Sequence, residues 1–172
     1  MTKIEKRLSI IFSLFAILWC CLIFWYSSRV ANLSDYDSSS VFDLFLKIFY
    51  PKYRGFSDIE KLVFQDKYMY LFRKFAHFTE YAILGFFIYP ALSFLKPKAK
   101  QIFFSFFYCL LFAISDEYHQ LFVPGREGKV TDVCIDFFGA TFGICAVLLV
   151  FYIVNKTAQK KDEGLKPSSF TF

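Results

Sequence analysis

The feature that most constrains the fold is a run of 19 residues, 8–26, that contains no charged side chain. An α-helix rises about 1.5 Å per residue, so a helix of this length spans about 30 Å, the thickness of a bilayer's hydrocarbon core. A secretory signal peptide is the competing interpretation because Lys3, Lys6 and Arg7 precede the run. The run is longer than a usual signal-peptide core, and residues 26–29 contain no good small-x-small cleavage site. We therefore predict a retained membrane anchor.

Three further apolar runs follow, over about residues 75–95, 101–123 and 133–154. Apolar residues make up 56% of the chain, above the roughly 45–50% that is typical of soluble domains. Unlike the first run, these three contain ionisable residues. The sequence predicts an all-α membrane protein, with a bundle of four transmembrane helices within residues 8–154.

The charges between the runs predict the orientation. Basic residues gather in the N-terminal tail (1–7), between the second and third runs (Lys96, Lys98 and Lys100), and in the C-terminal tail (155–172). Four crossings place these three segments on the same side of the membrane. By the positive-inside rule this side is the cytoplasm, so both termini are expected to be cytoplasmic. The segment 27–73 and the short loop near Gly125 are then external.

The first external segment is expected to hold short amphipathic helices. Within residues 41–49, apolar side chains recur at helical spacing, which suits a helix lying on the membrane surface. Ser57 and Glu60 form a capping-box pattern immediately before another apolar helical pattern. A second helix is therefore predicted to begin after Ser57.

Buried charges are predicted to meet near the external end of the bundle. Counted from the external ends of their helices, Glu80, Asp116 and Asp136 lie roughly 9, 10 and 6 Å inward. Asp136 continues a stripe that includes Gly139 and Gly143, whose small size lets helices approach closely. We expect this stripe to face the bundle. An ion in a membrane span costs about 2.5–3.5 kcal/mol on insertion scales, so the clustered groups should be paired or hydrated.

Three segments resemble the signature motifs of the VanZ-like membrane family. They are RKFAHFTEYAILG at 73–85, SDEYHQLFVPGR at 115–126 and TDVCIDFFGA at 131–140, in the family's order and spacing. Members often carry Asn at the position of Asp136, so the resemblance implies that its charge is dispensable. The resemblance implies a ligand-binding set made of the aligned positions Lys74, His77, Glu80, Tyr81, Asp116, Glu117, Gln120, Arg126 and Asp132.

The resemblance also implies a multi-pass protein of the bacterial plasma membrane and cell envelope. The family's founding member is associated with resistance to glycopeptide antibiotics, especially teicoplanin. The expected partners are membrane lipid and an amphiphile near the outer leaflet, either a lipid-linked cell-wall precursor, a polyprenyl phosphate or a lipoglycopeptide. The net charge of +5 does not indicate nucleic acid, because the charges lie between apolar segments and form no basic face.

Three other interpretations stay open at this stage. The charged cluster could be a structural polar network, a transport site, or the site of a membrane-embedded hydrolase or transferase that acts on a lipid-linked cell-wall intermediate. In the last case His77, Glu80, Asp116 and Glu117 are the catalytic candidates. Carboxylate and imidazole groups also suit metals. The sequence does not show whether a metal or a cofactor binds, or how many copies assemble. It contains no recognised hydrolase motif.

Overall fold

The computed structural model describes residues 3–164, without the side chains of residues 31–35 and 161–164. The described chain consists of α1 (Lys3–Ser27), α2 (Ala31–Phe49), the 3₁₀-helix η1 (Pro51–Gly55), α3 (Asp58–Ala91), α4 (Lys98–Gln120) and α5 (Val130–Gly164). These residues contain no strand, which confirms the all-α expectation. Three segments are long and apolar enough to cross a membrane: Lys3–Ser27, Lys98–Gln120 and Val130–Lys160.

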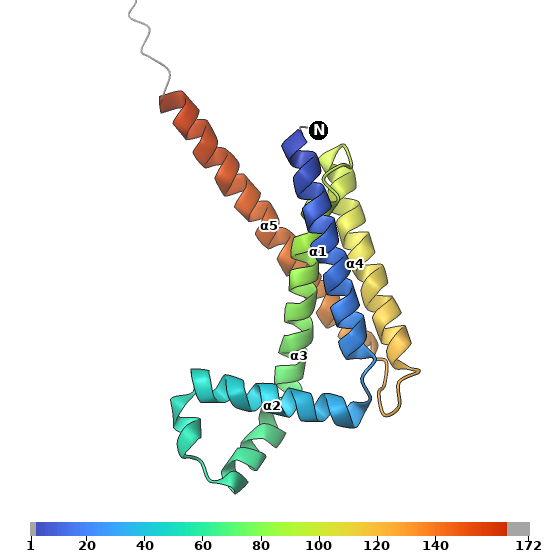
Figure 1. The fold of residues 1–172 in the computed structure, drawn as a ribbon, viewed down its shortest axis with the longest axis vertical. Helices are drawn as coiled ribbons and strands as arrows, with labels where there is room; N and C mark the ends of the chain where they lie inside the picture. Colours follow the sequence, from blue (N-terminus) through green and yellow to red (C-terminus); the bar gives the residue numbers. More distant parts are fainter. Residues whose placement is uncertain (1–2, 165–172) are drawn as a thin grey trace, which may run out of the picture.

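The long helices form a bundle, and α2 lies across one end of it (Figure 1). α1, α4 and the later part of α3 run alongside one another, whereas α5 crosses them obliquely. α3 has the most extensive contact with α5 and also packs against α1 and α4. The buried centre of the bundle is apolar and includes Ala16, Ile23, Leu84, Ile88, Ala113, Ile144 and Val147. We call the end where α1 stops and α5 starts the α2 end.

α3 is longer than predicted because two expected helices are continuous. The helix predicted to follow Ser57 and the apolar run at 75–95 join into one helix, Asp58–Ala91. The capping box is present: the Glu60 N–H donates to Ser57 Oγ (3.3 Å) and the Ser57 N–H donates to Glu60 Oε2 (2.7 Å). No Gly or Pro occurs between Ser57 and Gly85, so nothing interrupts the helix.

The other helix bounds also differ from the predicted ranges. α4 ends at Gln120 rather than near 123, and α5 begins at Val130 and runs on to Gly164. Residues 155–164 of the predicted C-terminal tail therefore continue α5, and residues 165–172 lie outside the described residues.

α2, η1 and the start of α3 enclose a small apolar core of their own, which we call the α2 lobe. Phe42, Leu46 and Tyr53 are buried in it. The Tyr53 hydroxyl donates to Asp43 Oδ1 (3.1 Å), and Lys47 pairs with the same carboxylate (2.5 Å). The hydrogen bond from Lys47 holds the pKa of Asp43 below its usual value. The lobe is thus a packed unit and not an extended loop.

Glycines bring α3 and α5 into backbone contact. A Cβ atom at Gly143 would lie 1.8 Å from the carbonyl oxygen of Ala82, and one at Gly139 would lie 2.2 Å from that of Phe78. The expectation that the Gly139/Gly143 stripe faces the bundle is therefore confirmed. This close approach sets the early residues of α5 directly opposite the charged turns of α3.

Candidate ligand-binding site

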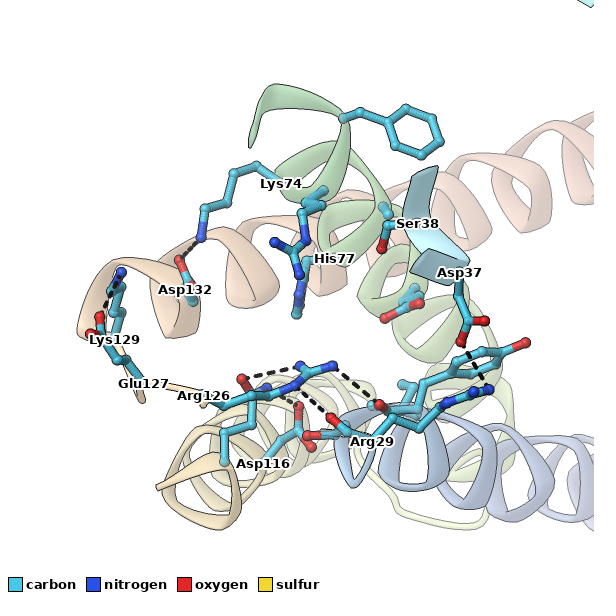
Figure 2. A pocket seen from close by; sticks show the side chains of 18 of the residues that line it. Arg29, Asp37, Ser38, Lys74, His77, Asp116, Arg126, Glu127, Lys129 and Asp132 are labelled. Atoms are coloured by element: carbon cyan, nitrogen blue, oxygen red, sulfur yellow. Dashed lines mark hydrogen bonds and ion pairs between the residues drawn. The ribbon is translucent and has the colours of Figure 1, made fainter. Parts of the chain in front are cut away.

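A polar cavity of about 550 Å³ opens at the α2 end of the bundle (Figure 2). Its walls come from α1, α2, α3, α4, the α4–α5 loop and the start of α5. The charged side chains that line it are Arg29, Asp37, Arg73, Lys74, Glu80, Asp116, Arg126, Glu127, Lys129 and Asp132. Charges from segments more than 100 residues apart in the sequence thus gather in one hollow.

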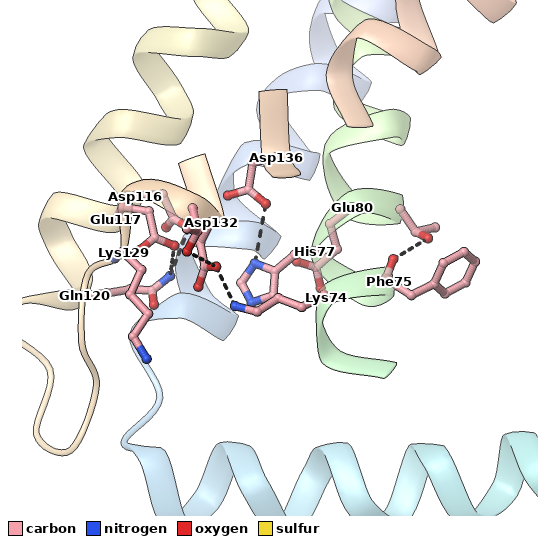
Figure 3. A network of polar contacts seen from close by, with 12 residues as sticks. Lys74, Phe75, His77, Glu80, Asp116, Glu117, Gln120, Lys129, Asp132 and Asp136 are labelled. Atoms are coloured by element: carbon pink, nitrogen blue, oxygen red, sulfur yellow. Dashed lines mark hydrogen bonds and ion pairs between the residues drawn. The ribbon is translucent and has the colours of Figure 1, made fainter. Parts of the chain in front are cut away.

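Two cross-helix pairs join α3 to α5 (Figure 3). Lys74 Nζ donates to Asp132 Oδ1, and both side chains are largely buried. One turn further along, His77 Nδ1 lies 3.6 Å from Asp136 Oδ1. This separation is longer than a hydrogen bond, and Asp136 is fully buried. The spacing of three residues on α3 and four on α5 places both pairs on facing helix surfaces.

The last turn of α4 carries a second buried polar group. Gln120 Nε2 lies 3.4 Å from both Asp116 Oδ2 and Glu117 Oε1, to which it can donate. Glu117 also accepts a hydrogen bond from the backbone N–H of Lys129 (2.8 Å). Glu117 thereby ties the end of α4 to the loop that leads into α5.

Arg126 connects the α4–α5 loop to the end of α1. Its Nε donates to the carbonyl oxygen of Arg29 (3.0 Å) and its Nη2 donates to that of Tyr26 (3.3 Å). A third bond, from Nη1, reaches Gln120 Oε1 (3.5 Å). Carbonyls at a helix C-terminus lack intrahelical donors, and the guanidinium supplies them. Gly125, with a φ of 79°, makes the turn that brings Arg126 there.

The predicted binding residues fall into two groups: those that line the cavity and those that are buried outside its lining. Seven line the cavity: Lys74, His77, Glu80, Asp116, Gln120, Arg126 and Asp132. Tyr81 and Glu117 are buried and lie outside the lining. The Tyr81 ring packs near that of Phe112 (6.1 Å between centroids), and its hydroxyl has no hydrogen-bond partner among the described residues. Glu80 is also anchored through its backbone, because Trp19 Nε1 donates to its carbonyl oxygen (2.8 Å).

Some residues of the site were absent from the predicted binding set. Arg29 and Asp37 pair across the cavity rim at 2.9 Å, and Asp136 backs His77. Asp136 was visible in the sequence as the residue one helical turn after Asp132. Asp37 had no comparable signal, because only the path of α2 across the bundle brings it to the cavity.

The cavity carries both signs of charge. Besides the Arg29–Asp37 pair and the pairs of α3 with α5, Lys129 Nζ lies 3.0 Å from Glu127 Oε2 at the exposed rim. This hydrogen bond raises the pKa of Lys129. The site therefore offers ammonium, guanidinium, imidazole and carboxylate groups to one ligand. Among the described residues, no cluster of three His, Cys, Asp or Glu side chains has the arrangement of a metal site.

Comparisons with known proteins identify the family. No curated protein and no solved structure matched the chain. The family model described as VanZ/LLP1 matches residues 12–154, most of the chain, including the three motif segments and every lining residue named above. Together with the apolar helices, this match makes the chain a membrane protein that belongs to the VanZ/LLP1 family.

Proposed function

We propose that this protein crosses the plasma membrane four times, with the cavity facing the outer leaflet and both termini in the cytoplasm. Three crossings are the apolar segments of α1, α4 and α5. The fourth is the part of α3 inside the bundle, whose charged residues Lys74 and Glu80 face the cavity rather than lipid. The N-terminus and the lysine-bearing turn between α3 and α4 lie at the end opposite the cavity (Figure 1).

The position of α2 supports this orientation. It lies across the bundle ends, as expected for a helix in the membrane surface. Leu44, Ile48 and Phe49 are exposed in its C-terminal half, at spacings that suit burial in lipid headgroups. Asp37, Ser38 and Val41, nearer the N-terminus of α2, line the cavity. The cavity-lining residues and the exposed apolar residues thus follow one another along α2, which joins the polar site to the proposed lipid surface.

The function we propose is binding of an amphiphile, with its polar head in the cavity and its apolar tail along the exposed helices. The observation that carries this proposal is the charged cavity at one end of an apolar bundle. Polar pairs between membrane helices contribute on average only about 0.6 kcal/mol, which is a weak reason to keep so many ions. A ligand head group that forms ion pairs and hydrogen bonds with these side chains is a stronger reason for their presence.

The mixed charge of the site supports a particular class of head group. Lys74 and Arg126 suit phosphate or carboxylate, and Glu80 and Asp116 suit amines and hydroxyls. A lipid-linked cell-wall precursor, or a lipoglycopeptide such as teicoplanin, presents groups of both kinds. Sequestering either one at the outer leaflet would contribute to glycopeptide resistance.

Thermal unfolding of the purified protein in detergent tests the proposal. The ligands are a lipid-linked cell-wall precursor, a polyprenyl phosphate and teicoplanin, measured with wild type, Glu80→Gln and Asp66→Asn. Asp66 is an exposed carboxylate on the same helix and serves as the matched control. We expect one ligand at about 100 times its Kd to stabilise wild type and Asp66→Asn by about 2.7 kcal/mol, and Glu80→Gln far less.

The opposite result would favour a structural network. The contacts of Arg126 with the carbonyl oxygens of Tyr26 and Arg29, at and just past the end of α1, and the Lys74–Asp132 pair already hold elements of the bundle together. If no ligand shifts the melting curve of wild type and Glu80→Gln merely melts earlier, the charged cluster serves stability and the binding proposal fails.

A further inference from the structure

His77 differs from the other histidine of the chain in how its ring is used. The His119 ring stacks on Phe24 (4.4 Å between centroids), and its Nε2 lies 3.1 Å from Ser28 Oγ. One contact is with α1 and the other is with the residue that follows it, and neither Phe24 nor Ser28 lines the cavity, so His119 is a packed structural residue. The His77 ring lines the cavity, and its Nδ1 has no hydrogen-bond partner within the described residues.

Asp136 stands behind His77, which is its only ion-pair partner within the described residues. The side chain is fully buried, and neither carboxylate oxygen has a hydrogen-bond partner in the described part of the chain. His77 Nδ1, at 3.6 Å, is the ion-pair partner that the structure places beside it. Burying a carboxylate without a partner costs several kcal/mol. The imidazolium that forms when a neutral His77 accepts a proton would offset that cost.

This arrangement has the parts of a His–Asp general-base pair. The carboxylate orients the ring through Nδ1 and stabilises the imidazolium that forms when Nε2 accepts a proton. Nε2 is the ring nitrogen left to the cavity, since Nδ1 faces Asp136 (Figure 3). The present 3.6 Å separation fits a resting site, because catalytic hydrogen bonds are often long before substrate binds.

We propose that His77, oriented by Asp136, activates water to hydrolyse a phosphoanhydride bond in the head group of a lipid-linked diphosphate. This inference rests on the proposed amphiphile site and adds a reaction to it. His77 Nε2 takes a proton from water while the water oxygen bonds to the terminal phosphorus. The bond from that phosphorus to the bridging oxygen breaks, and its electron pair stays on the bridging oxygen. The imidazolium returns its proton to this oxygen, which gives inorganic phosphate and a lipid monophosphate.

Two basic residues of the cavity could bind the phosphate groups of the substrate. Lys74 reaches the site from α3, and Arg126 reaches it from the α4–α5 loop. Their positive charges would offset the charge that builds up on the phosphate oxygens as the bond breaks. In this scheme His77 is the catalytic residue, and Asp136 is a positioning residue that acts through it. The charge of Asp136 therefore matters in this chain, in contrast to what the family resemblance implied.

Phosphate release by the purified full chain tests the inference. The probes are farnesyl diphosphate and a C55 polyprenyl diphosphate in detergent micelles, with wild type, His77→Gln, Asp136→Asn and the matched control His119→Gln. We expect wild type and His119→Gln to release phosphate, and His77→Gln to lose at least about 100-fold in kcat. Asp136→Asn should lower kcat while its melting temperature and its thermal stabilisation by diphosphate stay at the wild-type values, which a loss of folded protein would not allow.

Thermal shifts with the same diphosphates separate the two proposals. Stabilisation of His77→Gln by diphosphate without turnover would support the assignment, because binding then survives the loss of the base. Wild type that is stabilised by diphosphate but releases no phosphate would overturn the catalytic inference and leave the binding site intact. Equal turnover by wild type and His77→Gln would also overturn it. If His77→Gln does not fold, the kcat of Asp136→Asn decides, and a wild-type value would refute the pair.

Discussion

Each charged side chain at the α2 end has to replace the hydration that it loses on burial. The residues do so in different ways. Lys74 and Asp132 pair directly, Arg126 donates to backbone carbonyls, and Glu117 accepts from a backbone N–H. Asp136 alone of these has no hydrogen bond among the described residues. The well-satisfied groups can hold the site in shape, and the poorly satisfied one marks where chemistry or a ligand would act.

Removing only one partner of the Lys74–Asp132 pair should destabilise the protein more than removing both. Lys74→Met removes the ammonium but keeps the side-chain length, and it leaves the Asp132 carboxylate buried. We expect a loss of about 3–5 kcal/mol in the free energy of unfolding, measured by thermal or denaturant unfolding in detergent. The double variant Lys74→Met/Asp132→Asn should recover part of this loss. The single variant Asp132→Asn completes the cycle. If the double variant loses as much as Lys74→Met and Asp132→Asn lose together, the pair does not couple α3 to α5.

At the scale of elements, the α3–α5 contact positions the site. Its glycines allow the two backbones to touch, and the charged turns of both helices come next to this contact. A shift of α5 along α3 would separate His77 from Asp136. The small residues therefore determine the geometry of a site to which they contribute no chemistry.

A methyl group at Gly143 should force the helices apart. Alanine is normally favoured over glycine within a helix by about 1 kcal/mol, so any destabilisation by Gly143→Ala reports the clash with Ala82. We expect a loss of about 1–3 kcal/mol in the free energy of unfolding. Gly55→Ala is the control, since a Cβ atom there would meet nothing within 4 Å. Equal melting temperatures for Gly143→Ala and wild type would show that α5 has a different register.

The α2 lobe should lose stability when Asp43 is protonated. Its pKa is lowered in the folded protein, mainly by the hydrogen bond from Lys47. The stabilisation is therefore present above the ordinary value of 3.8 and is lost as the pH falls through the lower folded value. The melting temperature of wild type should exceed that of Asp43→Asn at about pH 6, and the two should converge as the pH falls through the lowered folded pKa of Asp43. A difference that does not change with pH would exclude an ionic contribution.

For the whole molecule, the two ends of the bundle differ in what they present. The α2 end carries the cavity, the α2 lobe and the α4–α5 loop, and the opposite end carries the N-terminus and the α3–α4 turn (Figure 1). An amphiphile from the outer leaflet could reach the cavity only if the α2 end is external. The proposed function therefore depends on the topology.

Cysteine labelling tests that topology directly. In a chain whose native cysteines are replaced, Glu127→Cys should react with a membrane-impermeant maleimide on intact cells, because Glu127 is exposed at the cavity rim. Lys98→Cys, in the exposed first turn of α4, should react only after the cells are opened. The reverse pattern would place the cavity in the cytoplasm and remove the basis for an outer-leaflet ligand.

Several features of the protein could be predicted from residues that are close in sequence. The apolar runs indicated the helices, because a chain in lipid must satisfy its backbone groups locally. The Ser57–Glu60 pattern predicted the start of α3, since a capping box acts within four residues. The motif segments indicated the family, and helical spacing placed the Gly139/Gly143 stripe against the bundle.

The tertiary structure decided what depends on the crossing of distant segments. Nothing local shows that Asp37 reaches the cavity, that Arg126 binds the carbonyl oxygens of Tyr26 and Arg29, or that Asp136 rather than Glu80 backs His77. These contacts depend on the angle and register between helices, which packing at the glycines and loop paths determine together. The sequence by itself determined which chemical groups lie near the ends of the apolar helices, and the tertiary structure determined which of them meet.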